Sequence, residues 1–361
     1  MGVNAMALPR SRWWRRLSVI ELYLWAFRLA VVLVVVWGVV GTVRAARYSG
    51  EVWLDFVVFG FSQGAIYALI ALGYTMVYGI LRMINFAHGD IFMVGAYTAY
   101  YAARALDQRG IFNSRPLLSL ALILVVAMVV SMVTALLVER VAYRPLRRAP
   151  RLVPLISAIG ASFFLEYAVR GLYGSGFQAY PEFNVFKGEW VLFGVGILRT
   201  QAVVIVSALI LMAALYLFVM RTKTGTAMRS VAEDMEVAAL MGINVDRIIV
   251  ITFAIGGAAA GAAGILYALV FKQVHFFMGF YPGIKAFTAA VLGGIGNIPG
   301  ALLGGVALGL IESVAPILVL DGLGIVAPYQ LKDVTAFIML VMVLIFRPSG
   351  ILGERLATKK A

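Results

Sequence analysis

Ten hydrophobic segments follow one another along this chain, separated by short links that hold most of its charged residues. A helix needs about 20 predominantly apolar residues to cross a bilayer, and most of these segments reach that length. The sequence therefore predicts an all-α polytopic membrane protein with roughly eight to ten transmembrane helices. The eighth segment is shorter and is expected to form a half-helix or a re-entrant element. The segments cover residues 20–43, 54–80, 88–106, 117–139, 152–173, 200–220, 248–271, 284–297, 300–319 and 331–346.

Composition excludes the main soluble classes of protein. Apolar residues make up 63% of the 361 residues and charged residues only 13%, about half the share of an ordinary soluble domain. The net charge of +13 therefore indicates basic cytoplasmic links, not a nucleic-acid partner. Cysteine is absent and the two histidines are far apart in sequence. We expect no metal site, no cofactor and no catalytic residue.

The distribution of Lys and Arg predicts the orientation. With the N-terminus inside, the inner links, including both chain ends, hold eighteen Lys and Arg and the outer links nine. Basic residues favour the cytoplasmic side, so both termini are expected in the cytoplasm, with an even number of spans.

The first hydrophobic segment follows four arginines, and a cleaved signal peptide is the alternative interpretation. The sequence Thr42-Val43-Arg44 is a poor cleavage site and Glu21 interrupts the apolar run, so an uncleaved anchor is preferred. We divide the chain into an extra N-terminal anchor (1–50), a main body (51–354) and a cytoplasmic tail (355–361).

Two links are long enough to carry structure of their own. The outer link 174–199 has turn residues and an alternating stretch, Glu189–Phe193, which predicts a small hairpin. The inner link 221–247 predicts a short amphipathic helix, capped by Thr224 or Thr226 and ended by Gly242. Its small-residue positions favour docking of a partner over a solvated linker.

Four segments of the sequence resemble the permease family of branched-chain amino acid ABC importers, whose members are subunits of high-affinity leucine, isoleucine and valine uptake systems. The resemblance runs from about residue 54 to residue 354, and the first 50 residues lie outside the family pattern. Asp90 stands where the family often has Glu. The four segments are Ile84–Asp90, Glu139–Arg147, the link 221–247 and Lys285–Gly300.

This resemblance implies a non-enzymatic permease subunit in a bacterial inner membrane, with a permease domain over 51–354. Its partners would be a second homologous permease or a second copy, two ATP-binding subunits and an extracytoplasmic solute-binding protein. Independently, the chain has no G-x-x-x-x-G-K-[ST] motif, so if ATP drives transport, a separate subunit must hydrolyse it. The residues expected to couple to that subunit are Gly225, Arg229, Ala232, Glu233, Asp234, Ala238, Gly242 and Ile243.

Two segments interrupt hydrophobic runs with polar or flexible residues and are expected to line the translocation pathway. Unwound backbone at membrane depth is tolerated only inside protein or beside water. The alternatives are structural: Asn85 as a helix N-cap, Asp90 as a favourable charge in the first turn, and the spaced glycines as packing positions. The pathway candidates are Asn85, Phe86, His88, Asp90, Gly293, Gly294, Gly296, Asn297 and Pro299.

A few charges fall inside hydrophobic segments. Glu166 and Arg170 are four apart and are expected to pair, and Lys285 is expected to extend toward the interface. Two functional alternatives stay open. One is a permease for urea or short amides within the same family. The other is an ion-coupled secondary transporter using Asp55, Glu166 or Glu312, which leaves the link 221–247 unexplained.

Overall fold

The computed structural model describes residues 19–147, 149–150, 152–192, 195–347 and 349–353. Within this part, eight helices are long and apolar enough to cross a membrane, which confirms the all-α polytopic class. The helices are α1 (Val19–Ala45), α2 (Gly50–Leu81), α3 (His88–Gln108), α4 (Ile111–Ser114), α5 (Pro116–Val138), α6 (Leu152–Tyr173), α7 (Arg199–Arg221), α8 (Lys223–Glu233), α9 (Met235–Leu240), α10 (Val245–Phe271), α11 (Phe280–Gly293), α12 (Ile298–Ala315) and α13 (Lys332–Phe346). Short π or 3₁₀ turns are η1 (Glu139–Tyr143), η2 (Arg144–Leu146), η3 (Asn184–Phe186), η4 (Pro316–Leu320) and η5 (Pro328–Leu331).

Helices α3 and α11 are not counted in these eight, but they pack between them. Helix α11 has 14 residues and is about 21 Å long at 1.5 Å per residue, which is less than the roughly 30 Å of a hydrocarbon core. It is the short eighth segment that the sequence predicts. Helix α3 begins with a polar turn, His88–Asp90, whose three residues are all buried inside the protein.

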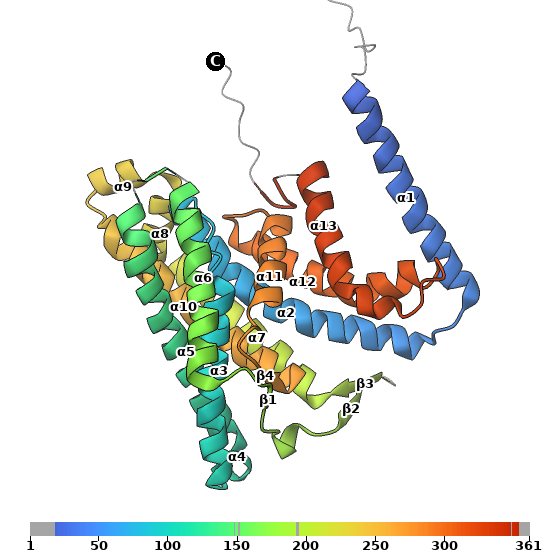
Figure 1. The fold of residues 1–361 in the computed structure, drawn as a ribbon, viewed down its shortest axis with the longest axis horizontal. Coiled ribbons are helices and arrows are strands. Elements are labelled where there is room, and N and C mark those ends of the chain that lie inside the picture. Colours follow the sequence, from blue (N-terminus) through green and yellow to red (C-terminus); the bar gives the residue numbers. More distant parts are fainter. Residues whose placement is uncertain (1–18, 148, 151, 193–194, 348, 354–361) are drawn as a thin grey trace, which may run out of the picture.

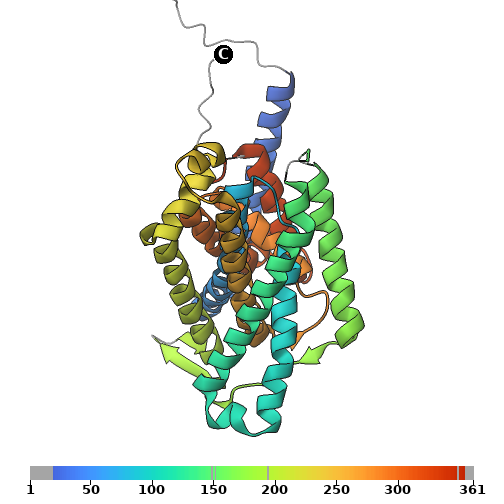
Figure 2. The ribbon, with the colours of Figure 1, turned by 90° about the vertical axis from the view of Figure 1, so that its left-hand side faces the viewer.

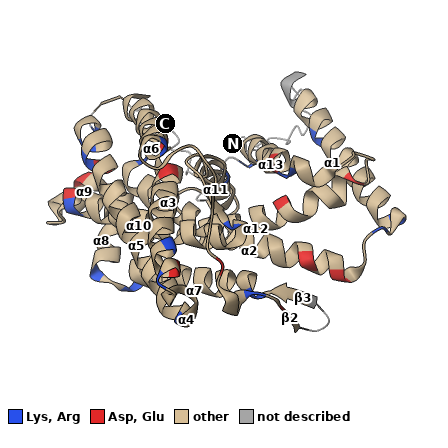
Figure 3. Ribbon diagram, turned by 60° about the horizontal axis from the view of Figure 1, so that its bottom comes forward, with Lys and Arg blue, Asp and Glu red and all other residues tan. Residues whose placement is uncertain are grey.

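The long helices connect two ends of the molecule (Figures 1 and 2). Helices α8 and α9 lie at one end, together with the start of α1 and the end of α13. Helix α4 and the short strands lie at the opposite end. Charged residues are sparse along the helices between these ends (Figure 3).

Helix α2 runs through the core and packs against α10, α11 and α12. Small residues permit this close packing, because a Cβ added to Gly309 would lie 2.3 Å from the Gly64 nitrogen. The spaced glycines of α10 act in the same way toward α5: a Cβ at Gly261 would lie 2.3 Å from the Ala127 carbonyl oxygen. The structure thus supports the packing role of this glycine spacing.

The four short strands form two antiparallel ribbons. Strands β2 (Glu189–Leu192) and β3 (Val195–Leu198) pair with Glu189 opposite Leu198, which confirms the predicted hairpin. Strands β1 (Gln178–Ala179) and β4 (Gln273–Val274) pair with Gln178 opposite Val274. This second ribbon ties the link before α7 to the segment after α10.

Helix α1 packs against η4 at one end and leaves most of its length exposed (Figure 1). Gly38 and Gly41 allow the contact, since added Cβ atoms there would lie 2.4 Å from the carbonyl oxygens of Val319 and Gly322. The Thr42 hydroxyl also donates to the Ile317 carbonyl at 3.3 Å.

Candidate functional site

The link 221–247 folds as two short helices instead of the single predicted helix. Thr222, not Thr224 or Thr226, caps α8, and its Oγ1 accepts a 3.0 Å hydrogen bond from the Gly225 nitrogen. Asp234 then breaks the helix, because its Oδ1 accepts from the nitrogens of Glu236 (2.9 Å) and Val237 (3.0 Å) and so starts α9. Gly242, at a φ of +83°, follows directly after the end of α9, where the sequence places a stop.

Close contacts hold α8 against the transmembrane helices. A Cβ on Gly225 would lie 2.2 Å from the Val219 carbonyl oxygen at the end of α7, so only glycine fits there. The side chains of Met228 and Val231, which belong to α8, are buried. From the link after α2, Arg82 Nη2 donates a 2.8 Å hydrogen bond to the Ala232 carbonyl. Helix α8 is therefore attached to both α7 and the end of α2.

The predicted coupling residues divide into buried anchors and exposed positions. Gly225 and Ala238 are buried, and Ala232 and Ile243 are partly buried. Arg229, Glu233, Asp234 and Gly242 are exposed. Besides the exposed Glu236, α9 and the residue after it expose three large apolar side chains: Val237 is 53%, Leu240 86% and Met241 77% exposed. We refer to these three residues as the α9 ridge. In the sequence, the apolar pair Leu240-Met241 directly before Gly242 indicates this ridge.

A charged bridge fixes the segment that contains Glu139. Arg147 binds the buried Glu139 carboxylate and reaches Asp246 Oδ1 at 2.5 Å. Glu139 follows α5, and Asp246 lies in the first turn of α10. The bridge therefore joins two helices on the side of the molecule that carries α8 and α9.

Asn85 does not cap α3, and the structure corrects that interpretation. Ala87 occupies the N-cap position and makes no side-chain cap. The Tyr143 hydroxyl lies 3.2 Å from both Asn85 Oδ1 and the Ile84 carbonyl oxygen. Asn85 thus attaches the turn before α3 to η1.

His88 packs inside the core. Its ring meets Tyr74 edge-on, with centroids 4.7 Å apart, and its Nε2 has no hydrogen-bond partner among the described residues. A Cβ at Gly73 would lie 2.3 Å from that nitrogen, so Gly73 makes room for the imidazole.

A cavity of about 170 Å³ lies between α3, α6 and α11, and we refer to it as the α3–α6 cavity. Of the predicted pathway residues, Phe86 and Asp90 line it, whereas Asn85 and His88 do not. Aromatic and aliphatic side chains form most of its wall. Three polar side chains of α3 and α6 also face it: Asp90, Ser162 and Glu166. Ser162 donates a hydrogen bond to Asp90 Oδ2.

The second predicted pathway segment, 293–299, is unwound as expected between Gly294 and Asn297, and it is held by the chain near residue 352. Asn297 Oδ1 caps α12 by accepting from the Gly300 nitrogen at 3.0 Å, and its Nδ2 donates to the Leu352 carbonyl at 2.9 Å. The positive φ of Gly294 (+104°) and Gly296 (+97°) permits the turn. Pro299 lies in the first turn of α12, where no amide donor is needed.

The two pathway segments approach each other without sharing the α3–α6 cavity. Ile84 and Ile295 border one small cavity together with Phe287 of α11. Phe287 also lines the α3–α6 cavity and therefore lies between the two segments.

Two expectations about charges in the hydrophobic segments are wrong. Lys285 does not extend to an interface; its Nζ is buried and donates to Glu312 Oε1 at 2.6 Å and Asp333 Oδ1 at 2.5 Å. Arg170 does not pair with Glu166. Its guanidinium lies over the rings of Tyr167 and Phe276, at 5.9 and 5.4 Å. Contacts with neighbouring helices decide the case of Lys285, and contacts with aromatic rings decide that of Arg170.

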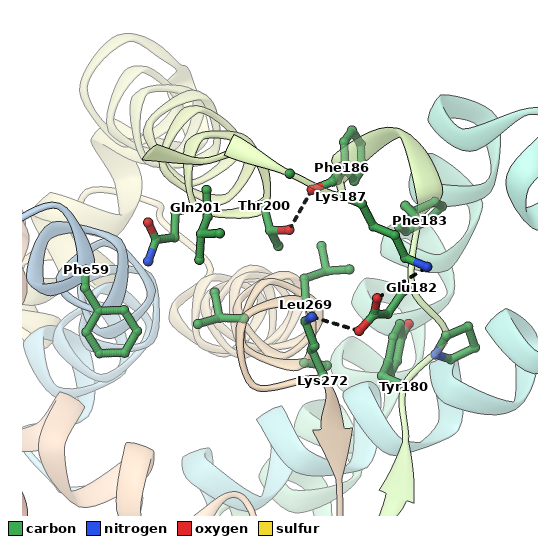
Figure 4. Close-up of a pocket in the computed structure, with 15 residues that line it drawn as sticks. Phe59, Tyr180, Glu182, Phe183, Phe186, Lys187, Thr200, Gln201, Leu269 and Lys272 are labelled. Atoms are coloured by element: carbon green, nitrogen blue, oxygen red, sulfur yellow. Dashed lines mark hydrogen bonds and ion pairs between the residues drawn. The ribbon is translucent and has the colours of Figure 1, made fainter. Parts of the chain in front are cut away.

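A second cavity, of about 180 Å³, lies at the end of the molecule that holds the strands (Figure 4). Glu182 faces it and binds Lys272 Nζ at 2.7 Å and Lys187 Nζ at 3.7 Å. The hydrogen bond from Lys272 lowers the pKa of Glu182, and the charges of both lysines act in the same direction. Because both lysines bind Glu182, this cavity offers no unpaired carboxylate to a solute.

A polytopic helical bundle with a helix pair at one end and a partly polar cavity between its helices defines a membrane permease. The chain belongs to the family described as branched-chain amino acid transport system / permease component, which matches residues 56–344. The match begins after α1.

Curated relatives cover nearly the same region. The high-affinity branched-chain amino acid transport system permease protein BraD of Pseudomonas aeruginosa is 46% identical over 84% of this chain and 96% of its own length. LivH of Escherichia coli K12, which carries the same description, is 44% identical over 82% of this chain and 94% of its own length. A probable branched-chain amino acid transport permease protein LivH of Methanocaldococcus jannaschii is 30% identical over 79% of this chain and 88% of its own length.

Proposed function

We propose that this chain is a pathway-forming subunit of an ATP-driven importer for branched-chain amino acids in a bacterial inner membrane. A second permease chain would complete the pathway, two ATP-binding subunits would supply energy, and a solute-binding protein would deliver the substrate from outside. The names of BraD and LivH support the substrate class over urea or short amides. Both termini and α8–α9 lie on the cytoplasmic side in this proposal.

The α9 ridge is the main observation that supports this proposal, because it offers a contact site for an ATP-binding subunit. Its apolar side chains are exposed at an end of the molecule, where no lipid tail would cover them once α8–α9 projects into the cytoplasm. Exposed apolar clusters of this kind mark contact sites for other proteins. The N-caps of α8 and α9 and the hydrogen bond from Arg82 to Ala232 fix the ridge relative to the transmembrane helices. A movement of a bound ATPase would therefore be passed to α7 and α10.

The ion-coupled alternative lacks suitable carboxylates among the residues named for it. Glu312 is engaged by Lys285, and Asp55 is exposed on the surface of α2. Glu166 and Glu312 each keep one buried carboxylate oxygen without a hydrogen-bond partner, but of the three residues only Glu166 faces the α3–α6 cavity. We assign that cavity, with Phe86 and Asp90, to the solute pathway, and the segment 293–299 to its inner end.

Copurification tests the ATPase contact. In the complete complex, Leu240→Glu or Met241→Glu should reduce recovery of the ATP-binding subunits and abolish solute-stimulated ATP hydrolysis, while the permease stays in the membrane. Glu233→Lys and Gly242→Leu should also abolish stimulation. Val326→Glu, at a 92% exposed apolar position between η4 and η5, is the matched control and should change neither. Normal recovery and stimulation in both ridge variants would show that the ATPase binds elsewhere.

A further inference from the structure

The α3–α6 cavity combines an apolar wall with one acidic corner. Phe86, Phe163 and Phe287 contribute to the wall, with Ile159 and Ile284. Asp90 and Glu166 form the corner; they are 2% and 3% exposed, and their side chains lie within hydrogen-bonding reach of each other. Ile159 and Phe163 are 40% and 53% exposed on α6, so the cavity opens on the outer side of that helix.

No cation within the described part of the chain compensates this acidic corner. The ion pairs found there leave out both Asp90 and Glu166. Arg170, one turn from Glu166, is engaged by two aromatic rings instead. One Glu166 oxygen, Oε1, is buried and lacks a hydrogen-bond partner. Buried carboxylates are normally paired or fully hydrogen-bonded, so the unpartnered Glu166 oxygen is available to a cationic donor.

We propose that the acidic corner binds the α-ammonium group of the transported amino acid, while the aromatic wall receives its aliphatic side chain. This inference rests on the proposed function and adds to it the groups that recognise the substrate. A primary ammonium offers three hydrogen-bond donors, which can reach Asp90 and the free Glu166 oxygen together. An apolar cavity of about 150 Å³ admits benzene, so the 170 Å³ here accommodates a branched aliphatic chain.

The proposal also explains how the site can hold a zwitterion without trapping it. The two carboxyl groups attract the ammonium end, whereas the apolar wall contacts the side chain without directional bonds. A ligand with the ammonium and the branched chain but no carboxylate should therefore bind, and one with only the carboxylate should not.

The test uses cysteine protection in the complete transporter in nanodiscs without the solute-binding protein. The native chain has no cysteine, so Ile159→Cys gives a single reactive thiol at the cavity, and Phe164→Cys, 72% exposed on the same helix, gives a control outside it. Millimolar leucine or 3-methylbutylammonium should slow maleimide labelling of Ile159→Cys by roughly threefold at twice its dissociation constant. 4-Methylpentanoate and sodium should have no effect, and Phe164→Cys should not respond.

Asp90→Asn or Glu166→Gln, added to Ile159→Cys, should weaken protection by the amine by about tenfold in concentration, whereas Asp107→Asn, exposed near the end of α3, should not. Equal protection by 4-methylpentanoate, protection by sodium alone, or unchanged protection in both variants would overturn the ammonium site. ATP-driven leucine uptake with the binding protein is measured on the same preparation. Uptake without protection refutes only this inference, whereas absence of leucine uptake refutes the proposed function.

Discussion

Lys285 donates a 2.6 Å hydrogen bond to Glu312, and both side chains are buried at the contact of α11 with α12. Asp333, in the first turn of α13, accepts a second bond from the same ammonium at 2.5 Å. Three consecutive helices, the first of which is too short to cross a bilayer alone, are thereby joined at one point. An unpaired charge here would be costly, because Glu312 is fully buried and Lys285 is its one cationic partner among the described residues.

Lys285→Met should lower the free energy of unfolding by about 3–5 kcal/mol, since it leaves Glu312 charged and buried without its partner. The double variant Lys285→Met with Glu312→Leu should recover most of that loss. Thermal unfolding in nanodiscs measures both. Lys272→Met removes a lysine whose side chain is 58% exposed in its pair with Glu182 and should cost less than about 1 kcal/mol. Equal losses of unfolding free energy in the single and double variants would contradict the conclusion that Lys285 compensates the charge of Glu312.

Gly225→Ala should uncouple ATP hydrolysis from transport more than it disturbs folding. The new methyl group would lie 2.2 Å from the Val219 carbonyl oxygen, so α8 must move away from α7 and carry the α9 ridge with it. Gly171→Ala on α6, where nothing lies within 4 Å, is the matched control. Solute-stimulated ATP hydrolysis per assembled complex is the measurement, and wild-type stimulation in Gly225→Ala would exclude a positional role for α8.

Cysteine accessibility should depend on the state of the transporter. Asn297→Cys, at a partly exposed position, should react with a water-soluble maleimide in the resting complex. Cysteines at the buried positions Asn85, His88 and Gly294 should react only when ATP or solute delivery opens the pathway. Labelling rates are compared with a lipid-facing control at Val129, which is 47% exposed on α5. If the three buried positions stay inert in every state, neither segment lines the pathway.

Deletion of residues 1–48 should reduce insertion or assembly more than turnover per assembled complex. Most of α1 is exposed, and its contacts with η4 lie near its C-terminal end, where Thr42 donates to the Ile317 carbonyl. Just beyond the two elements, Arg47 and Asp321 form an ion pair at 3.1 Å. Uptake normalised to purified complex separates the two effects. Normal assembly with a large loss of turnover would instead give α1 a direct part in transport.

The Glu182–Lys272 contact should weaken in acid. Because the folded protein lowers the pKa of Glu182, its contribution to stability is present above the ordinary carboxyl pKa of about 4.5 and is lost as the pH falls through the lowered value. Protection against hydrogen exchange in the outer link 178–187, corrected for the intrinsic exchange rate at each pH, should therefore be lost only below the ordinary carboxyl range. Glu182→Gln should remove this acid-dependent loss, and a loss of protection already near neutral pH would assign the effect to another group, such as His275.

The sequence by itself determined the features that depend on local pattern. The length and apolarity of the segments predict the spanning helices, because a helix crosses the hydrocarbon core only if it is long enough and mostly apolar. The stop at Gly242, the hairpin after Glu189 and the unwound turn at Gly294 also follow from local preferences, since positive φ favours glycine and alternating residues favour strands. Local pattern does not determine the N-cap of α8, because several threonines lie within one turn of each other, and the close approach of Gly225 to Val219 favours Thr222.

Only the tertiary structure decided which buried charges meet. Glu166 is four residues from Arg170, yet it lies beside Asp90, 76 positions away in the chain, because α6 packs on α3. Lys285 and Glu312 are 27 residues apart, and Asp333 is 48 from Lys285. In the low dielectric of a helical core, a charge is stabilised by whichever opposite charge or donor the packing brings within 3 Å, and one sequence does not encode those distances locally.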